Sequence, residues 1–248
     1  MIEATALTKR YGTTKAVDDL SFTVRPGHVT GFLGPNGAGK STTMRMILGL
    51  DRPSSGSVTV DGQCFADLPL PLYRVGALLD AQAVHGGRTA HAHLSALGRS
   101  NGVASSRVHT VLDQVGLASV AGKRVRGFSL GMKQRLGIAA ALLGDPGILI
   151  FDEPVNGLDP EGVRWIREMF RELATEGRTV LVSSHLMSEM ALTADHLLII
   201  GRGRLIADTS VDDFVAAAGS TRLMARSGDD AELARLLLAR GAAVEATA

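Results

Sequence analysis

Hydrophobic and polar positions change their spacing several times along the chain, and each change predicts a different element. Residues 1–30 alternate in the manner of strands, with turn-forming residues at RYGTTK and RPGH. VTGFL is an unbroken apolar run that predicts a buried strand. It leads through a glycine-rich turn to a predicted helix from Ser41 to about Leu48. SVTVDG predicts another short strand with a turn behind it.

In the second half of the chain, strand and helix patterns alternate. Helical spacing dominates from about Thr89 to Leu143, with buried strands predicted before it at VGALL and after it at GILIF. EGVRWIREMFRELATEG predicts a helix, and TVLVSS and HLLII predict further strands. This alternation indicates a parallel sheet with crossover helices. We expect one domain at 1–215, with an inserted helical subdomain at about 82–143. A short extension of unknown role follows at 216–248, where AELARLLLARG predicts an amphipathic helix.

Composition narrows the class of protein. The 248 residues are 45% hydrophobic, which is sufficient for one large domain with a core. The net charge of +1 and the scattered Lys and Arg residues argue against a nucleic-acid partner. The single cysteine, Cys64, excludes an internal disulfide and fits a reducing compartment. LGIAAALLG is shorter than the roughly 18 apolar residues of a membrane span, and the N-terminus lacks the apolar centre of a signal peptide. We therefore expect a cytoplasmic protein that reaches a membrane only through a partner.

A phosphate-binding loop is predicted after the strand VTGFL. GPNGAGKST fits G-x-x-x-x-G-K-[ST] and lies between a predicted strand and a predicted helix, as that motif requires. Its glycines allow the backbone N–H groups to point at phosphates, Lys40 would reach the β- and γ-phosphates, and the Ser41 hydroxyl would bind Mg²⁺. The alternative is a glycine-rich turn that contains an accidental lysine. The residues of the loop are Gly34, Pro35, Asn36, Gly37, Ala38, Gly39, Lys40, Ser41 and Thr42.

Two acidic residues follow the buried strand ILIF. Asp152 and Glu153 would lie at the carboxyl edge of the sheet, which is where ligands bind in open α/β folds. Asp152 would hold Mg²⁺, directly or through water, because hard cations take oxygen ligands. Glu153 would orient and deprotonate the attacking water. The alternative is an ordinary polar turn after a strand.

A second helix start lies in FSLGM, just before the apolar run LGIAAALL. Taken together with the phosphate loop and ILIFDEP, it makes about residues 2–215 resemble the ATP-binding subunit of ABC transporters. SLGMKQR is similar to the signature motif of that family, although Leu130 and Met132 replace a glycine and the glutamine. The resemblance implies an α/β P-loop NTPase with a RecA-like parallel sheet core, an N-terminal antiparallel β subdomain and an inserted α-helical subdomain.

The resemblance also implies a head-to-tail dimer, in which the signature motif of one copy caps the nucleotide held by the other. Ser129 and Gly131 would then serve a nucleotide on a second copy of the chain, and Asp159 matches the loop that crosses to the partner's site. His185 matches the histidine that contacts the γ-phosphate, and Tyr11 matches the aromatic residue that stacks on adenine. The alternatives are an N-cap role for Ser129, a structural histidine and an edge-strand tyrosine.

One position departs from the family pattern. A glutamine that senses the γ-phosphate and Mg²⁺ usually follows the strand here represented by VGALL, whereas this chain has Asp80 there and Gln82 two residues later. A carboxylate about 4 Å from a phosphate oxygen costs roughly 4 kcal/mol at an effective dielectric constant near 20. That cost disappears if Mg²⁺ lies between them. We therefore expect Asp80 to contact the metal and Gln82 to be a weaker substitute.

The function implied by this resemblance is ATP hydrolysis that drives a separate membrane permease. Glu153, His185 and Lys40 are the expected catalytic residues, and ATP and Mg²⁺ the expected cofactors. GALLDAQAVH and FSLGMKQRLGIAAALL look most like the branch of drug and antibiotic exporters. The alternative is a non-transport ABC-type ATPase that acts on nucleic acid or the ribosome. The histidines that we expect to be surface residues rather than metal ligands are His85, His91, His93 and His109.

Overall fold

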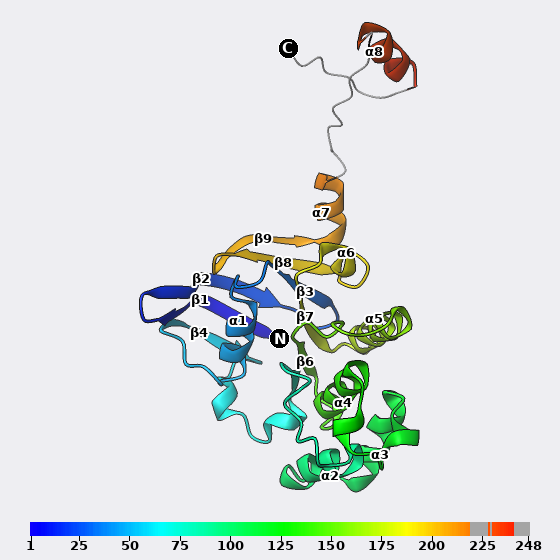
Figure 1. The fold of residues 1–248 in the computed structure, drawn as a ribbon. Helices are drawn as coiled ribbons and strands as arrows, with labels where there is room; N and C mark the ends of the chain where they lie inside the picture. The colour runs from blue at the N-terminus through cyan, green and yellow to red at the C-terminus, as the bar shows by residue number, and fades with distance from the viewer. Residues whose placement is uncertain (219–227, 229, 241–248) are drawn as a thin grey trace. The chain divides into compact units, whose positions relative to one another are not determined.

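The fold is built on two β-sheets, one of three strands and one of six, both of which are drawn in Figure 1. The computed structural model describes residues 1–218, 228 and 230–240. It divides the chain into two units, Met1–Asp213 and Phe214–Ala248. Both sheets belong to the first unit.

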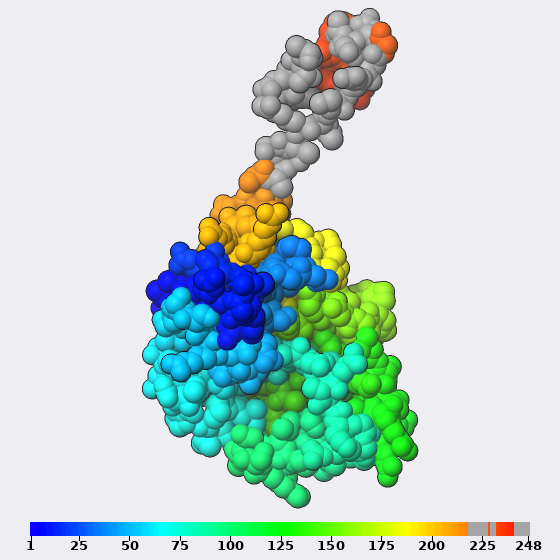
Figure 2. Space-filling model, turned by 60° about the vertical axis from the view of Figure 1, so that its left-hand side comes forward, coloured from blue at the N-terminus to red at the C-terminus, as the bar shows by residue number. Residues whose placement is uncertain are grey.

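The smaller sheet is antiparallel and has the strand order β2-β1-β4. It consists of β1 (Ile2–Tyr11), β2 (Thr14–Val24) and β4 (Ser55–Val60). Apolar side chains that recur along β1 and β2 are buried beneath the sheet, as alternation in a half-buried strand requires. On the face drawn in Figure 2, the blue surface of β1 and β2 adjoins the cyan surface of β4 and the segment after it. The strands predicted within residues 1–30 are thereby confirmed.

The larger sheet has the order β5-β6-β7-β3-β8-β9 and forms the centre of the unit. All neighbours are parallel except β8 and β9, which pair as an antiparallel hairpin. Every residue of β3, β6 and β7 is buried, because helices and the small sheet cover both faces. The strands are β3 (Val29–Leu33), β5 (Val75–Leu78), β6 (Ile148–Phe151), β7 (Thr179–Ser184), β8 (His196–Gly201) and β9 (Arg204–Ser210).

A helix follows each of the strands β3, β6 and β7 of the large sheet. The first, α1 (Lys40–Ile47), starts one residue before the predicted Ser41, and α5 (Pro160–Thr175) corresponds to the predicted helix after the acidic pair. Phe170 of α5 packs on Phe151 of β6 with 4.8 Å between ring centroids. The short α6 (Met187–Met190) lies between β7 and β8.

The helical stretch in the middle of the chain contains α2 (Ala90–Ser100), α3 (Ser105–Gln114) and α4 (Leu130–Leu142). These helices pack on one another in the green part of Figure 1, and α4 lies directly on β5. Glycine permits that approach, since a Cβ atom at Gly76 would lie 2.0 Å from the Ala141 carbonyl oxygen. Short 3₁₀ turns connect the surrounding segments at Phe65–Asp67, Pro71–Tyr73, Ala118–Val120 and Val125–Gly127.

The C-terminal part of the chain adds two helices. α7 (Val211–Ala218) follows β9, and α8 (Asp230–Ala239) lies in the second unit and corresponds to the predicted amphipathic helix. Part of the predicted extension at 216–248 lies outside the described residues. None of the helices that the structure describes is both long and apolar enough to cross a membrane.

Candidate active site

The phosphate loop connects the end of β3 to the start of α1, as its motif predicts. Two of its glycines are sterically required. Gly39 has φ +107°, and a Cβ atom there would lie 2.6 Å from the Ala16 carbonyl oxygen. A Cβ atom on Gly34 would lie 2.5 Å from the carbonyl oxygen of Ile200. The loop is therefore held between β2 and the end of β8, so its backbone conformation is fixed by the fold.

Lys40 places its ammonium group at the inner side of this loop. The side chain is only 6% exposed, and Nζ donates a hydrogen bond to the Gly34 carbonyl oxygen at 2.7 Å. Nζ also lies 3.4 Å from Glu153 Oε1. Ser41 occupies the next position of the first helical turn and is exposed, whereas Thr42 is half-buried. The loop therefore places a fixed cation and an exposed serine at a helix N-terminus, which suits a polyphosphate.

The acidic pair follows β6 at the carboxyl edge of the large sheet. A single hydroxyl group connects its two members: Ser183 Oγ on β7 accepts a hydrogen bond from the Glu153 N–H at 2.9 Å and donates one to Asp152 Oδ1. The Asp152 N–H in turn donates to the Leu78 carbonyl oxygen on β5 at 2.8 Å. Three neighbouring strands thus orient the two carboxylates. Ser183 gave no motif signal in the sequence, because only the pairing of β6 with β7 brings it here.

His185 lies just beyond β7 and completes a line of three charged or titratable groups. Its Nδ1 is 2.9 Å from Glu153 Oε2, while Glu153 Oε1 faces Lys40. The predicted catalytic residues Lys40, Glu153 and His185 therefore lie together, although they come from β3–α1, β6 and β7. A carboxylate held between a cation and an imidazole can accept a proton from a water molecule placed beside it.

Tyr11 lies at the end of β1, beside the helix that follows the phosphate loop. Its hydroxyl group donates to Asp51 Oδ2 at 3.0 Å, and half of the residue is exposed. Partial burial, together with the hydrogen bond to Asp51, raises the pKa of Tyr11, whereas nearby Thr42 of the loop acts in the opposite direction. The ring is thus fixed next to the loop with exposed surface on which a flat base can stack.

Ser129, Gly131 and Asp159 form a separate group. Ser129 is the N-cap of α4 and accepts from the Met132 N–H at 3.2 Å, and Asp159 is the N-cap of α5 and accepts from the Gly162 N–H at 3.0 Å. Within the described residues, no hydrogen bond or ion pair joins them to the phosphate loop of their own chain. Ser129 and Asp159 are exposed, so they remain available to another molecule.

Asp80 lies in the exposed turn after β5. Its Oδ1 accepts from the Gln82 N–H at 2.7 Å, which fixes the carboxylate over its own turn. The predicted ligands Ser41, Asp152 and Asp80 offer only hard oxygen donors, which is the chemistry that Mg²⁺ prefers. The described residues contain no cluster of three or more His, Cys, Asp or Glu side chains that could hold a metal without a substrate. A metal here would take the rest of its ligands from phosphate oxygens or water.

The four histidines of the middle stretch lie away from this line. His91 and His109 are in ring contact at 5.2 Å between centroids, and burial lowers the pKa of His93.

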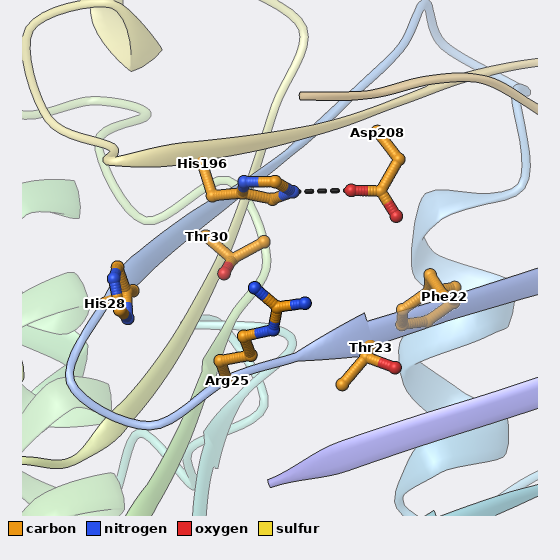
Figure 3. Close-up of a pocket in the computed structure, with 7 residues that line it drawn as sticks. All are labelled: Phe22, Thr23, Arg25, His28, Thr30, His196 and Asp208. Atoms are coloured by element: carbon orange, nitrogen blue, oxygen red, sulfur yellow. Dashed lines mark hydrogen bonds and ion pairs between the residues drawn. The ribbon is translucent and has the colours of Figure 1, made fainter. Parts of the chain in front are cut away.

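A separate hollow of about 210 Å³ opens at the amino ends of β3 and β8, the opposite edge of the sheet from the phosphate loop (Figure 3). There His196 contacts Asp208 near Arg25 and Thr30. Neither the histidines of the middle stretch nor this hollow forms part of the site at the carboxyl edge.

Comparison with known proteins agrees with the arrangement at the carboxyl edge. Residues 17–156, more than half of the chain, match the family model described as ABC transporter. The bacitracin transport ATP-binding protein BcrA of Bacillus licheniformis is 43% identical over 86% of this chain and 70% of its own length. The lantibiotic transport ATP-binding protein SrtF of Streptococcus pyogenes is 35% identical over 86% of this chain and 92% of its own.

Solved structures lead to the same family. The structure of an ATP-binding subunit of an ABC transporter superimposes with a TM-score of 0.80 at 28% identity, covering 96% of this chain and 99% of the other. A dimeric ATP-binding cassette bound to ADP and phosphate shares the fold, with a TM-score of 0.77 at 23% identity and coverage of 85% and 99%. The predicted fold class is confirmed, and the alternative of a non-transport ATPase gains no support. The chain belongs to the ABC transporter family and is one of its ATP-binding, ATP-hydrolysing subunits.

Proposed function

We propose that this chain hydrolyses ATP at the carboxyl edge of its large sheet to drive the export of a peptide antibiotic or similar amphiphile through a separate membrane permease. The observation that carries the proposal is the line of contacts from Lys40 through Glu153 to His185, with separations of 3.4 and 2.9 Å. It joins the motif that would hold the triphosphate to the residue that would activate water. Three side chains in contact are stronger support for an active site here than any one of them alone.

Glu153 is proposed as the general base. A bound triphosphate competes with Glu153 for the Lys40 ammonium group, so that binding frees Oε1 to accept a hydrogen bond from the attacking water. As the water oxygen bonds to the γ-phosphorus, the carboxylate takes the proton, and the bond to the β–γ bridging oxygen breaks to release ADP. Lys40 and the loop N–H groups stabilise the developing negative charge. His185 keeps the carboxylate in place and contacts the γ-phosphate.

Ser41 and Asp152 are proposed to hold Mg²⁺, and Asp80 to reach it directly or through water. When bound, this ion neutralises charge on the β- and γ-phosphates. Ser183 helps to present Asp152, since its hydroxyl group donates to one carboxylate oxygen and leaves the other free to bind a cation. Asp80 is exposed, and the Gln82 N–H engages only its Oδ1, so its Oδ2 is the oxygen proposed to reach the ion. If Asp80 acts through the metal, Asp80→Asn should change the Mg²⁺ dependence of ATP hydrolysis, whereas unchanged dependence would argue against it.

A second copy of the chain is proposed to complete each site. Ser129 and Gly131 lie at the start of α4, where N–H groups and the helix dipole favour a phosphate, and Asp159 lies at the start of α5. Because both starts are exposed and remain unlinked to their own phosphate loop, they suit a nucleotide held by another subunit. A dimeric cassette with the same fold supports this arrangement. ATP would act by binding the closed dimer more tightly than the open one.

The permease and its cargo are proposed from the relatives named in the comparisons, two of which are bacitracin and lantibiotic transport proteins. The subunit would act on the cytoplasmic side of the membrane. The test is to co-express this chain with the membrane protein encoded beside it, and to measure co-purification and resistance to a bacitracin-type or lantibiotic peptide. Lys40→Ala should abolish the resistance without preventing co-purification. Lys123→Ala, an exposed lysine outside the site, is the matched control. Resistance that is indifferent to Lys40→Ala would contradict the proposal.

A further inference from the structure

The backbone of Glu153 adopts a conformation that its side chain disfavours. Its φ is +47°, in the left-handed region that non-glycine residues rarely occupy. Glu153 lies two residues beyond the end of β6, and a relaxed φ would rotate its carboxylate away from its present direction. Such a conformation persists only where neighbouring groups hold it. The groups that hold Glu153 therefore also set the direction of the proposed base.

Hydrogen bonds fix both polar groups of the Glu153 backbone. The N–H donates to Ser183 Oγ at 2.9 Å, and the carbonyl oxygen accepts from the Asn156 N–H at 3.2 Å. The carbonyl oxygen also accepts from Gln134 Nε2 at 3.3 Å, and the same nitrogen donates to the Pro154 carbonyl oxygen at 2.8 Å. Two adjacent carbonyl groups are thus tied to one side-chain amide.

Gln134 is well placed for this task. It is 5% exposed and lies on α4, not on the loop that it holds. Since both of its partners are carbonyl oxygens, only the NH₂ end of the side chain can face them, which fixes its orientation. A buried amide with both hydrogens engaged is rigid, because breaking either bond leaves an unsatisfied buried group.

We propose that Gln134 is a positioning residue for ATP hydrolysis, which holds Glu153 in its productive direction through the backbone. The inference rests on the proposed role of Glu153 as base. Gln134 would act through Glu153, because its amide nitrogen is engaged by the Glu153 and Pro154 carbonyl oxygens. Because it lies five residues after Ser129 on α4, it also ties the orientation of the base to the helix whose start is proposed to serve the partner's nucleotide.

A second contact joins the same two segments. Leu130 lies against Gly157, where an added Cβ atom would be only 2.2 Å from Leu130 Cδ2. This leucine takes the place of a family glycine, and Gly157, at φ +78°, leaves the space for it. Leu130 and Gln134, one helical turn apart, thus dock the start of α4 on both ends of the loop from Glu153 to Gly157. The start of α4 and this loop form one packed element.

The test is Gln134→Met, which keeps the length of the side chain and removes the donor. Gln114→Met, an exposed glutamine on α3, is the matched control. We expect Gln134→Met to lower kcat by roughly 10- to 100-fold with ATP KM changed less than about threefold, since the phosphate loop is untouched. Gln134→Asn keeps the amide but is too short to reach both carbonyl groups, so it should lower kcat in the same way and serves if the methionine variant does not fold.

A double-mutant cycle separates positioning from general damage. In a Glu153→Gln background the base is already lost, so adding Gln134→Met should lower the residual rate by less than about twofold. If Gln134→Met lowered kcat by the same factor in both backgrounds, the inference about Gln134 would be wrong. It would also be wrong if Gln134→Met kept the parental kcat while Glu153→Gln was impaired. Either result would leave the proposed function intact. A parental rate for Glu153→Gln itself would instead overturn the proposed function, and this inference with it.

Discussion

At the scale of single residues, the site depends on how one carboxylate is surrounded. Glu153 presents one oxygen to Lys40 and the other to His185, while its backbone is held by Ser183 and Gln134. No other acid among the described residues combines these contacts. The charge of the Glu153 carboxylate, its direction and its strained backbone all depend on these neighbours. Small substitutions at Glu153 should therefore have large effects on turnover.

Replacing Glu153 by glutamine should separate nucleotide binding from hydrolysis. Glutamine keeps the shape but cannot accept the proton, so kcat should fall by about 10²–10⁴-fold. Lys40 and the loop N–H groups remain, so ATP should still bind and hold two subunits together. Steady-state ATPase assays and size-exclusion chromatography with ATP would measure both effects. Parental turnover by the variant would show that Glu153 is not the base.

Tyr11 offers a test of base stacking. Stacking on an aromatic side chain contributes about 1–3 kcal/mol per base, so Tyr11→Ala should weaken ATP binding by roughly 5- to 100-fold. Tyr11→Phe keeps the ring, loses the interactions of the hydroxyl group with Asp51 and Thr42, and should bind nearly as well as the parent. Tyr73→Ala removes a tyrosine that bonds to Gly102 outside the site and is the control. Equal losses for the phenylalanine and alanine variants would show that the hydroxyl group, not the ring, is what counts.

At the scale of elements, the helical stretch is joined to the sheet by very close contacts. α4 approaches β5 so closely that Gly76 has no space for a Cβ atom, and Gly137 faces Leu78 with similarly little room. From Leu136 to Leu142, α4 is buried on most sides, which agrees with the apolar sequence of that half of the helix. The start of this helix and the loop that carries Glu153 are consequently parts of one packed arrangement rather than two independent loops.

Gly76→Ala tests that packing. The added methyl group would lie 2.0 Å from the backbone oxygen of Ala141, which a side-chain rotation cannot relieve. The free energy of unfolding should fall by about 3 kcal/mol. Gly122→Ala, where no heavy atom lies within 4 Å of the added carbon, should change it by less than about 0.5 kcal/mol. Urea unfolding would measure both, and equal stability of the two variants would contradict the close contact.

The sequence predicted the elements and residues that are marked by a pattern of neighbouring positions along the chain. The phosphate loop follows from four fixed positions, and buried strands such as β6 and β7 follow from unbroken apolar runs. Ser183 and Gln134 escaped prediction because their partners are 30 and 19 residues away, so that only the folded chain brings them to Glu153. No pattern in the sequence predicted β9, because none of its residues is buried and its pairing with β8 is visible only in the folded chain.

At the scale of the whole molecule, each chain carries two half-sites that face different nucleotides in the proposed dimer. One half comprises the phosphate loop, Glu153 and His185, and the other comprises Ser129, Gly131 and Asp159. The helix α4 and the loop after β6 connect the halves within one chain. Hydrolysis at one nucleotide can thereby depend on how the subunit engages the other. The central claim is that every complete site draws residues from two chains.

The most direct test mixes two inactive variants. Lys40→Ala disables the phosphate loop, and Ser129→Arg blocks the start of α4. In a head-to-tail dimer of one copy of each, both defects fall on the same site and the other site is intact. Each variant alone should be inactive, while an equal mixture should regain about a quarter of the parental ATPase rate, because about half of the dimers are mixed and each has one complete site. Full inactivity of the mixture, with both variants folded and forming dimers, would contradict the account.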